Sequence, residues 1–195
     1  ALVHVFGLGV LISGKSGVGK SECSLELIAR GHRLVADDIV IIKRLSANCL
    51  RGQGSEVLKH HMEIQGIGIV DIASLYGVGA ILNETDIDIH IKLEKWRTDK
   101  TYERVGIEDK YTRILGVAVP EYIIPIEPGR NLSIIVETVT LTQKMKDTGI
   151  NIAAQFNERL IERMVGAAGI TCPLPTAAQV KDTATGRALS KKDAP

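Results

Sequence analysis

An eight-residue run near the start of the chain, Gly14–Ser21, has the residue types of a phosphate-binding loop. Its sequence matches the pattern G-x-x-x-x-G-K-[ST] at every fixed position. Glycines keep side chains away from backbone N–H groups that must converge on a phosphate, and the helix that follows directs its positive end at the same anion. The pattern predicts phosphate binding by Gly14, Lys15, Ser16, Gly17, Val18, Gly19, Lys20 and Ser21. The alternative is an ordinary glycine-rich turn between a strand and a helix.

Two carboxylates follow the loop at a second candidate position. Asp37 and Asp38 come directly after an apolar stretch, and α/β folds place their ligand crevice at such strand ends. A carboxylate there could hold a metal or accept the proton of an attacking hydroxyl. Neighbouring strand residues point to opposite faces, so we expect the two not to face the phosphates equally. The alternative is a solvated turn.

The elements that must position these groups follow from the apolar pattern. Residues 10–13 form a short apolar strand that ends at the loop, and residues 21–30 have helical spacing that ends at Gly31. Residues 34–36 then read as a buried strand. This order of strand, loop, helix and strand predicts an α/β fold with a mixed sheet and flanking helices.

The rest of the chain continues the mixed pattern. We expect strands at 39–42, 86–94 and 122–126, a short helix at 71–76, longer helices at 131–146 and 151–165, and an irregular stretch at 45–62. The strict alternation of residues 86–94 is typical of a half-buried strand with antiparallel neighbours. The β-branched content of 131–146 also suits a strand, but its length favours a helix. We expect one catalytic domain at 1–170 and a flexible tail at 171–195.

Composition argues against several classes of protein. The 195 residues carry 24 Lys or Arg against 23 Asp or Glu, a net charge of +1, which disfavours a nucleic-acid binder. Val5–Ile12 is far shorter than the roughly 20 residues that span a bilayer, so no membrane association is expected. Three widely spaced cysteines form no Cys-x-x-Cys pair, which indicates a reduced, cytoplasmic protein without a zinc site.

Three separated motifs together resemble the HPr kinase/phosphorylase family. They are Gly14–Glu22, Gly31–Asp38 and Met62–Ile69, in that order, and the resemblance covers nearly all of residues 2–165. It implies a P-loop kinase that uses ATP and Mg²⁺ to phosphorylate a serine of the phosphocarrier protein HPr. The family also reverses this reaction with inorganic phosphate, giving pyrophosphate. It further implies a hexamer that regulates carbon metabolism and sugar transport.

The resemblance assigns roles to single residues. Lys20 and its loop match the nucleotide site, Ser21 and Glu63 the magnesium ligands, and Arg104 a catalytic arginine. Asp38, with Asp37 beside it, matches the proton acceptor of phosphorylation and the proton donor of the reverse reaction. A segment linked to dephosphorylation matches Pro125, Ile126, Glu127, Pro128, Gly129 and Arg130.

The chain departs from the family at two places. The family pattern has Arg where this chain has Gln65, which removes one positive charge near the site. The family's catalytic histidine would lie one position before residue 1, and its N-terminal domain lies outside this sequence.

Two other functions fit the phosphate loop. A P-loop kinase of a small molecule would need the same groups, whereas a non-catalytic nucleotide sensor would need the loop but no base. Asp38 and Arg104 separate the sensor from the enzymes. Of the weaker candidates, His60 and His61 are expected to be solvated, and Arg130 either binds phosphate or holds a turn.

Overall fold

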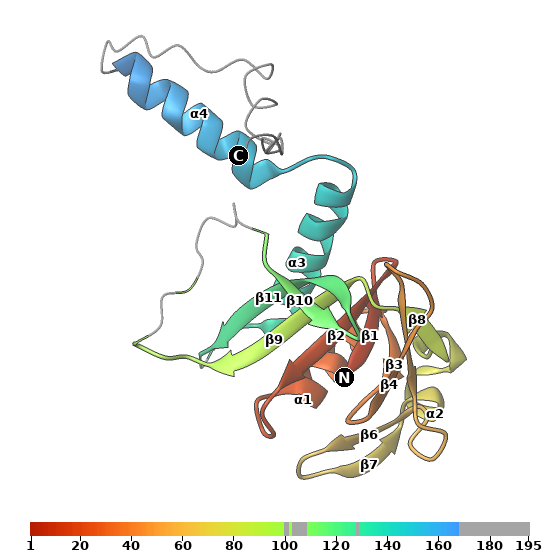
Figure 1. Cartoon of the computed structure of the whole chain (residues 1–195). Helices are drawn as coiled ribbons and strands as arrows, with labels where there is room; N and C mark the ends of the chain where they lie inside the picture. Colours follow the sequence, from red (N-terminus) through yellow and green to blue (C-terminus); the bar gives the residue numbers. More distant parts are fainter. Residues whose placement is uncertain (100–101, 103–108, 128, 168–195) are drawn as a thin grey trace, which may run out of the picture. The chain divides into compact units, whose positions relative to one another are not determined.

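A six-stranded mixed sheet carries the phosphate-binding loop (Figure 1). The computed structural model describes residues 1–99, 102, 109–127 and 129–167. The strands lie in the order β10-β11-β9-β2-β1-β3. Their bounds are β1 Leu2–Val5, β2 Leu8–Gly14, β3 Arg33–Ala36, β9 Ile89–Lys95, β10 Tyr111–Ile114 and β11 Val117–Ile126. The strands expected at 10–13, 34–36 and 122–126 are therefore confirmed.

Two helices cover one face of this sheet. Helix α1 (Lys20–Ala29) follows the loop, and α3 (Leu132–Asp147) follows β11. Both expected helices are confirmed, the second with Asn131 as its N-cap, whose side chain accepts a hydrogen bond from the Ile134 N–H. Apolar residues of β1, β2 and β9, such as Ile12 and Ile91, form the core beneath them. Burial of this apolar face holds β2, the strand that leads into the phosphate-binding loop, in place.

The alternating strand β9 lies between two parallel neighbours. It pairs with β2 on one side and β11 on the other, both parallel, so the antiparallel expectation was wrong. Ile89, Ile91 and Leu93 are fully buried, which confirms the expected apolar face. On the polar face, His90 hydrogen-bonds side chains of both neighbouring strands. The alternating sequence therefore predicted which face of β9 is apolar and which is polar. It did not predict whether the neighbouring strands are parallel or antiparallel.

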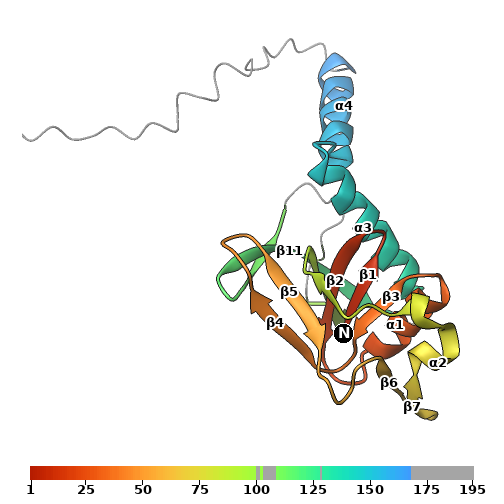
Figure 2. The same cartoon turned by 90° about the vertical axis from the view of Figure 1, so that its right-hand side faces the viewer.

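Two smaller sheets complete the body of the fold. The first contains β4 (Val40–Arg44), β5 (Leu50–Gly54) and β8 (Glu84–Asp86), and packs on the sheet face opposite the helices (Figure 2). The second is the hairpin of β6 (His61–Ile64) and β7 (Gly68–Asp71). The strand expected at 39–42 is confirmed, but the irregular stretch at 45–62 was wrong. Strand β5 was missed because it contains Gly52 and Gly54, which are not typical of strands. At Gly52 a Cβ would lie 2.4 Å from Leu2 Cδ2, so the packing requires glycine there.

A short helical segment follows the hairpin and leads to β8 of the three-stranded sheet. Helix α2 (Ile72–Tyr76) begins at Asp71, whose carboxylate accepts the Ala73 N–H at 3.0 Å, and confirms the helix expected at 71–76. A 3₁₀ turn at Val78–Ala80 follows it. Apolar side chains of the hairpin pack with Ile28 of α1 and Leu34 of β3. The hairpin is therefore held beside the end of β3.

The chain divides into two units, Ala1–Ala153 and Ala154–Pro195. Helix α4 (Ile152–Ala167) confirms the helix expected at 151–165, and it exposes apolar side chains at Phe156 and Leu160. The predicted end of the catalytic domain at residue 170 and the predicted tail lie outside the described residues. None of the helices in the described ranges is long and apolar enough to cross a membrane.

The start of β2 lies very close to the backbone of residues 86–88. The Gly9 N–H donates to Asp88 Oδ2 at 2.7 Å, and its carbonyl accepts the Asp88 N–H at 2.9 Å. A Cβ at Gly9 would lie 1.8 Å from the Asp86 carbonyl oxygen. Only glycine lets these two backbones lie so close.

Replacing Gly9 by Ala should lower the free energy of unfolding by about 1–3 kcal/mol or more, because backbone must move to accept the methyl group. Urea denaturation followed by circular dichroism measures the loss. The matched control is Gly79→Ala, since a Cβ there meets no atom within 4 Å. Equal stability of the two variants would contradict the close approach.

Helices α1 and α3 are joined by a charged cluster. Arg30 Nη2 lies 2.6 Å from Glu137 Oε2, and His32 Nε2 lies 2.9 Å from Glu137 Oε1. The hydrogen bond from Arg30, followed by that from His32, lowers the pKa of the Glu137 carboxyl. The ionised carboxylate therefore stabilises the folded state.

A Glu137→Gln variant should be less stable than the parent at pH 7, and this difference should shrink as the pH falls. A pKa that is lower in the folded state gives stability above the unfolded-state pKa, which is lost as the pH falls through the folded-state value. Urea midpoints measured from pH 7 to pH 3 test this. A difference that grows toward acid would show that the cluster does not stabilise the carboxylate.

Candidate active site

The phosphate-binding loop lies between the end of β2 and the start of α1. A Cβ at Gly14 would lie 2.6 Å from the Leu93 carbonyl oxygen, so the loop can begin here only with glycine. Gly17 and Gly19 have φ of 71° and 94°, a region that L side chains rarely adopt. The Lys20 ammonium donates to the Lys15 carbonyl at 3.3 Å and so lies back over the loop. Gly14, Gly17 and Gly19 therefore adopt backbone conformations or close contacts for which the sequence pattern requires glycine.

The loop is joined to the end of β3 by one side-chain hydrogen bond. The Ser21 hydroxyl, in the first turn of α1, donates to Asp37 Oδ2 at 2.8 Å. Asp37 is only 5% exposed, and its Oδ1 has no hydrogen-bond partner among the described residues. A buried carboxylate oxygen without a partner is costly unless a ligand completes it. Asp37 is therefore placed to act at the loop and not only to support its neighbour.

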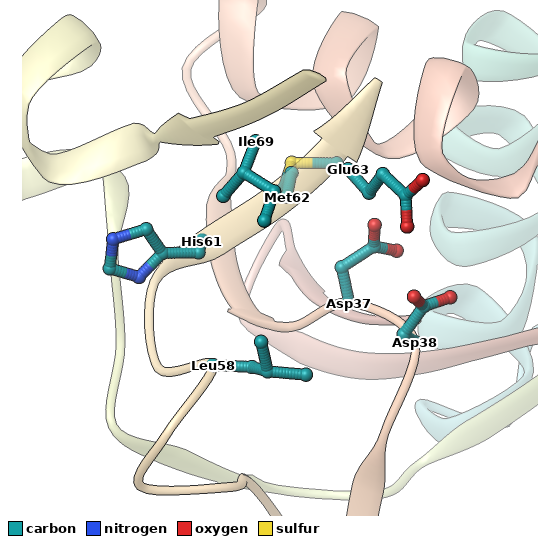
Figure 3. A pocket seen from close by; sticks show the side chains of 7 residues that line it. All are labelled: Asp37, Asp38, Leu58, His61, Met62, Glu63 and Ile69. Atoms are coloured by element: carbon teal, nitrogen blue, oxygen red, sulfur yellow. The ribbon is translucent and has the colours of Figure 1, made fainter. Parts of the chain in front are cut away.

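Asp38 directs its carboxylate to the same side as Asp37 (Figure 3). The alternation expected for two strand residues does not apply, because β3 ends at Ala36 and Asp38 has a φ of 51°. Asp tolerates this left-handed conformation better than most residues. The expectation that the two do not face the phosphates equally stays a prediction, and Asp37 is the one that is buried and bonded to Ser21. Asp38 is exposed, unlike Asp37.

Glu63 completes an acidic pocket with the two aspartates. The three carboxylates share a cavity of about 90 Å³ with Leu58, His61, Met62 and Ile69 (Figure 3). Met62 and Ile64 anchor strand β6 in the core, and Glu63 between them faces outward. His60 and His61 were expected to be solvated. His61 is exposed and also lines this pocket. The expectation was wrong for His60, which is half-buried and whose Nε2 is buried without a hydrogen-bond partner among the described residues. The motif around Glu63 thus lies beside Asp37, the residue that is hydrogen-bonded to Ser21.

The Ser21 and Asp37 oxygens fit a hard divalent cation. Mg²⁺ is usually bound by one or two carboxylates and hydroxyls, with phosphate oxygens and water filling the other positions. The buried Asp37 Oδ1 offers such an oxygen, and Glu63 offers another from the facing strand. No cluster of three or more His, Cys, Asp or Glu forms a complete cage in the described part of the chain. The phosphate ligand would have to complete the coordination.

A second, basic pocket lies on the other side of the loop. Its volume is about 540 Å³, and its lining includes Lys15 of the loop with Lys92, Lys95 and Arg97 of the β9 end. Because β2 and β9 are parallel, their carboxyl ends meet at one edge of the sheet. Sequence reasoning did not select these three cations; their place in and just after an alternating strand was the available signal.

The predicted dephosphorylation segment begins at the end of β11. Pro125 and Ile126 pair with Glu94 and Lys95 of β9, so the segment borders the basic pocket. Arg130 Nη1 donates to the Pro125 carbonyl at 3.0 Å, which favours the turn-holding role that was left open. Pro128 lies outside the described residues. The predicted catalytic Arg104 lies outside them as well.

Comparisons with known proteins agree with this geometry. A family model described as HPr Serine kinase C-terminal domain matches residues 1–160. An HPr kinase/phosphorylase of Thermoanaerobacter sp. is 51% identical over 163 residues, covering 84% of this chain and 53% of the relative. One from Leptospira biflexa is 52% identical over 161 residues, covering 82% and 50%. The chain thus spans about half the length of these curated relatives.

A solved structure has the same architecture. The HPr(Ser) kinase/phosphatase from Coxiella burnetii superposes with a TM-score of 0.70 at 35% identity, covering 80% of this chain and 95% of that one. The P-loop kinase fold expected from the sequence is confirmed.

Replacing Asp37 by Asn should remove the effect of Mg²⁺ on nucleotide binding, because the amide cannot supply the charged oxygen beside Ser21. We expect ADP affinity in the presence of Mg²⁺ to fall about 10- to 100-fold, with little change in EDTA. Titration calorimetry under both conditions measures this.

The matched variant Lys20→Ala should weaken ADP binding under both conditions, since it removes a phosphate contact that needs no metal. If Asp37→Asn keeps the full enhancement by Mg²⁺, Asp37 is not part of a metal site.

Proposed function

Because the chain belongs to the HPr serine kinase C-terminal domain family, we propose that it transfers the γ-phosphoryl group of ATP to a serine hydroxyl of HPr. The same site catalyses the reverse reaction, in which inorganic phosphate takes the phosphoryl group and pyrophosphate is formed. The enzyme is a protein-serine kinase and phosphorylase.

The observation that carries this proposal is the position of Asp38. Its exposed carboxylate lies in the acidic pocket beside Asp37, which is bonded to the first turn after the phosphate loop. A serine hydroxyl entering this pocket meets a base on one side and the bound phosphates on the other. Asp38 accepts the hydroxyl proton as the oxygen attacks phosphorus. This arrangement is what a nucleotide sensor would not need.

The remaining groups stabilise charge during transfer. Lys20 and the backbone N–H groups of the loop hold the phosphates. Ser21, Asp37 and Glu63 would hold Mg²⁺, which neutralises charge on the phosphate oxygens when bound. The catalytic role of Arg104, carried over from the family pattern, is part of the same proposal.

The reverse reaction uses the same carboxylate in its other protonation state. Phosphate in the loop attacks the phosphoserine, and the protonated Asp38 gives its proton to the leaving serine oxygen. The leaving group is then a neutral alcohol, which regenerates the acceptor of the forward reaction. The segment from Pro125 to Arg130, at the edge of the basic pocket, would serve this direction.

The surroundings of the pocket support a protein as the acceptor. Ile67 and Ile69 at the tip of the β6–β7 hairpin are 73% and 70% exposed, and Ile69 lines the pocket itself. Exposed apolar side chains beside a site are typical of protein-binding surfaces. This favours HPr over a small molecule. A hexameric assembly, a cytoplasmic location and control of carbon metabolism complete the proposal by family resemblance.

Replacing Asp38 by Asn should reduce transfer in both directions by about 100-fold or more, because the amide can neither accept nor return the proton. The assay incubates the chain with purified HPr, ATP and Mg²⁺, and then with phosphate and phosphoserine-HPr. Mass spectrometry of HPr and release of pyrophosphate are the two readouts.

The control is Glu56→Gln, which changes a carboxylate that is 83% exposed and should leave both rates unchanged. Calorimetry should show that Asp38→Asn still binds ATP. Normal phosphorylation of HPr by this variant would refute the role of Asp38, and a parent chain that binds ATP without modifying HPr would favour the nucleotide sensor.

A further inference from the structure

A row of three polar side chains crosses the middle of the main sheet. It consists of Ser13 on β2, His90 on β9 and Glu121 on β11, the three parallel strands beside the loop. His90 and Glu121 are direct register partners. Ser13 pairs with Lys92, which is the next residue after His90 on the same face of β9. The row lies opposite the apolar face that packs under α1 and α3.

The three side chains form a continuous hydrogen-bonded chain. Ser13 Oγ lies 2.7 Å from His90 Nε2, and His90 Nδ1 lies 3.1 Å from Glu121 Oε1. The His90 and Glu121 side chains are only 12% and 21% exposed. Bonds of this kind are stronger where water is excluded.

The chemistry of the three groups fixes the direction of both bonds. An ionised carboxylate only accepts, so the His90 Nδ1 must carry a proton. In the neutral imidazole Nε2 is then an acceptor, and the Ser13 hydroxyl donates to it. Burial lowers the pKa of His90, which keeps the ring neutral. Of the charged groups that act on it, Glu121 from β11 favours the protonated ring and Lys92 from β9 opposes it.

Ser13 is the residue directly before the phosphate-binding loop. The next residue, Gly14, packs against the Leu93 carbonyl so closely that no side chain fits. A shift of β2 against β9 would therefore move the first residue of the loop. The chain through His90 to Glu121 ties the end of β2 to two neighbouring strands by side chains, in addition to the backbone ladder.

We propose that Ser13, His90 and Glu121 form a positioning relay that holds the start of the phosphate-binding loop in register for phosphoryl transfer. These are positioning residues and touch neither nucleotide nor acceptor. The role rests on the proposed function, but nucleotide binding by the loop tests it separately from HPr phosphorylation. Misplacing a binding group by about 1 Å can cost up to about a hundredfold in rate.

The experiment compares Glu121→Ala with Glu121→Gln in the full chain. The alanine removes the acceptor for His90 Nδ1–H, whereas the glutamine side-chain oxygen can still accept it. We expect Glu121→Ala to raise the Kd and the KM for ATP about tenfold or more, with the KM for HPr unchanged. Glu121→Gln should stay near the parent values. Glu56→Ala, on an exposed carboxylate, is the control for loss of a negative charge.

Kinetics separate positioning from a merely structural role. Partial unfolding would lower the apparent kcat and leave the KM for ATP unchanged, because the remaining folded molecules bind normally. Circular dichroism of each variant checks the folded fraction. Calorimetric binding of ATP tests the relay even if the parent chain does not phosphorylate HPr, so failure of the proposed function is distinguishable.

Nitrogen-15 NMR of the histidine side chains gives a direct signature. In the parent chain His90 should carry its proton on Nδ1, and in Glu121→Ala it should shift toward the Nε2–H tautomer. A Ser13→Ala variant should weaken ATP binding as Glu121→Ala does. The proposal is overturned if His90 carries its proton on Nε2 in the parent, if Glu121→Ala keeps the parent's ATP affinity, or if Glu121→Gln loses as much as the alanine variant.

Discussion

The hydrogen bond from Ser21 to Asp37 is the contact on which the arrangement of the site depends. It joins the first turn of α1, and through it the phosphate-binding loop, to the end of β3. Both partners are held by packing, since α1 and β3 share the core that also carries the β6–β7 hairpin. Asp38 and Glu63 line the same pocket as Asp37. The loop and the acidic groups are thereby held next to each other.

Charge differs on the two sides of the loop. Carboxylates gather beside β3, and cations gather at the end of β9. The net charge of +1 conceals this division. It suits a reaction in which a metal and a proton acceptor work on one side while anionic groups are held on the other. The protein therefore attracts phosphate through local placement of charge and not through a general field.

The loop could be predicted from sequence because its backbone geometry requires particular residue types. Glycine stands where side chains do not fit, and Lys20 and Ser21 follow at fixed positions in the motif. The two aspartates could be located but not oriented, because orientation depended on the left-handed conformation of Asp38. Strand β5 could not be predicted because its glycines, which the close packing requires, do not have the apolar pattern of a strand. The partners of His90 could not be predicted, since they come from strands whose order is set by tertiary packing.

The antiparallel strand β1 lies between the strand that ends in the loop and the strand that ends at the aspartates. Adjacent strands are about 4.8 Å apart, so this single insertion separates β2 from β3 by roughly 10 Å. In effect β1 is a spacer that sets how far apart the phosphate-binding loop and the two aspartates stand. Its residues Val3 and Val5 are fully buried in the core. The distance between the loop and the aspartates is thus set by a strand to which no site residue was assigned.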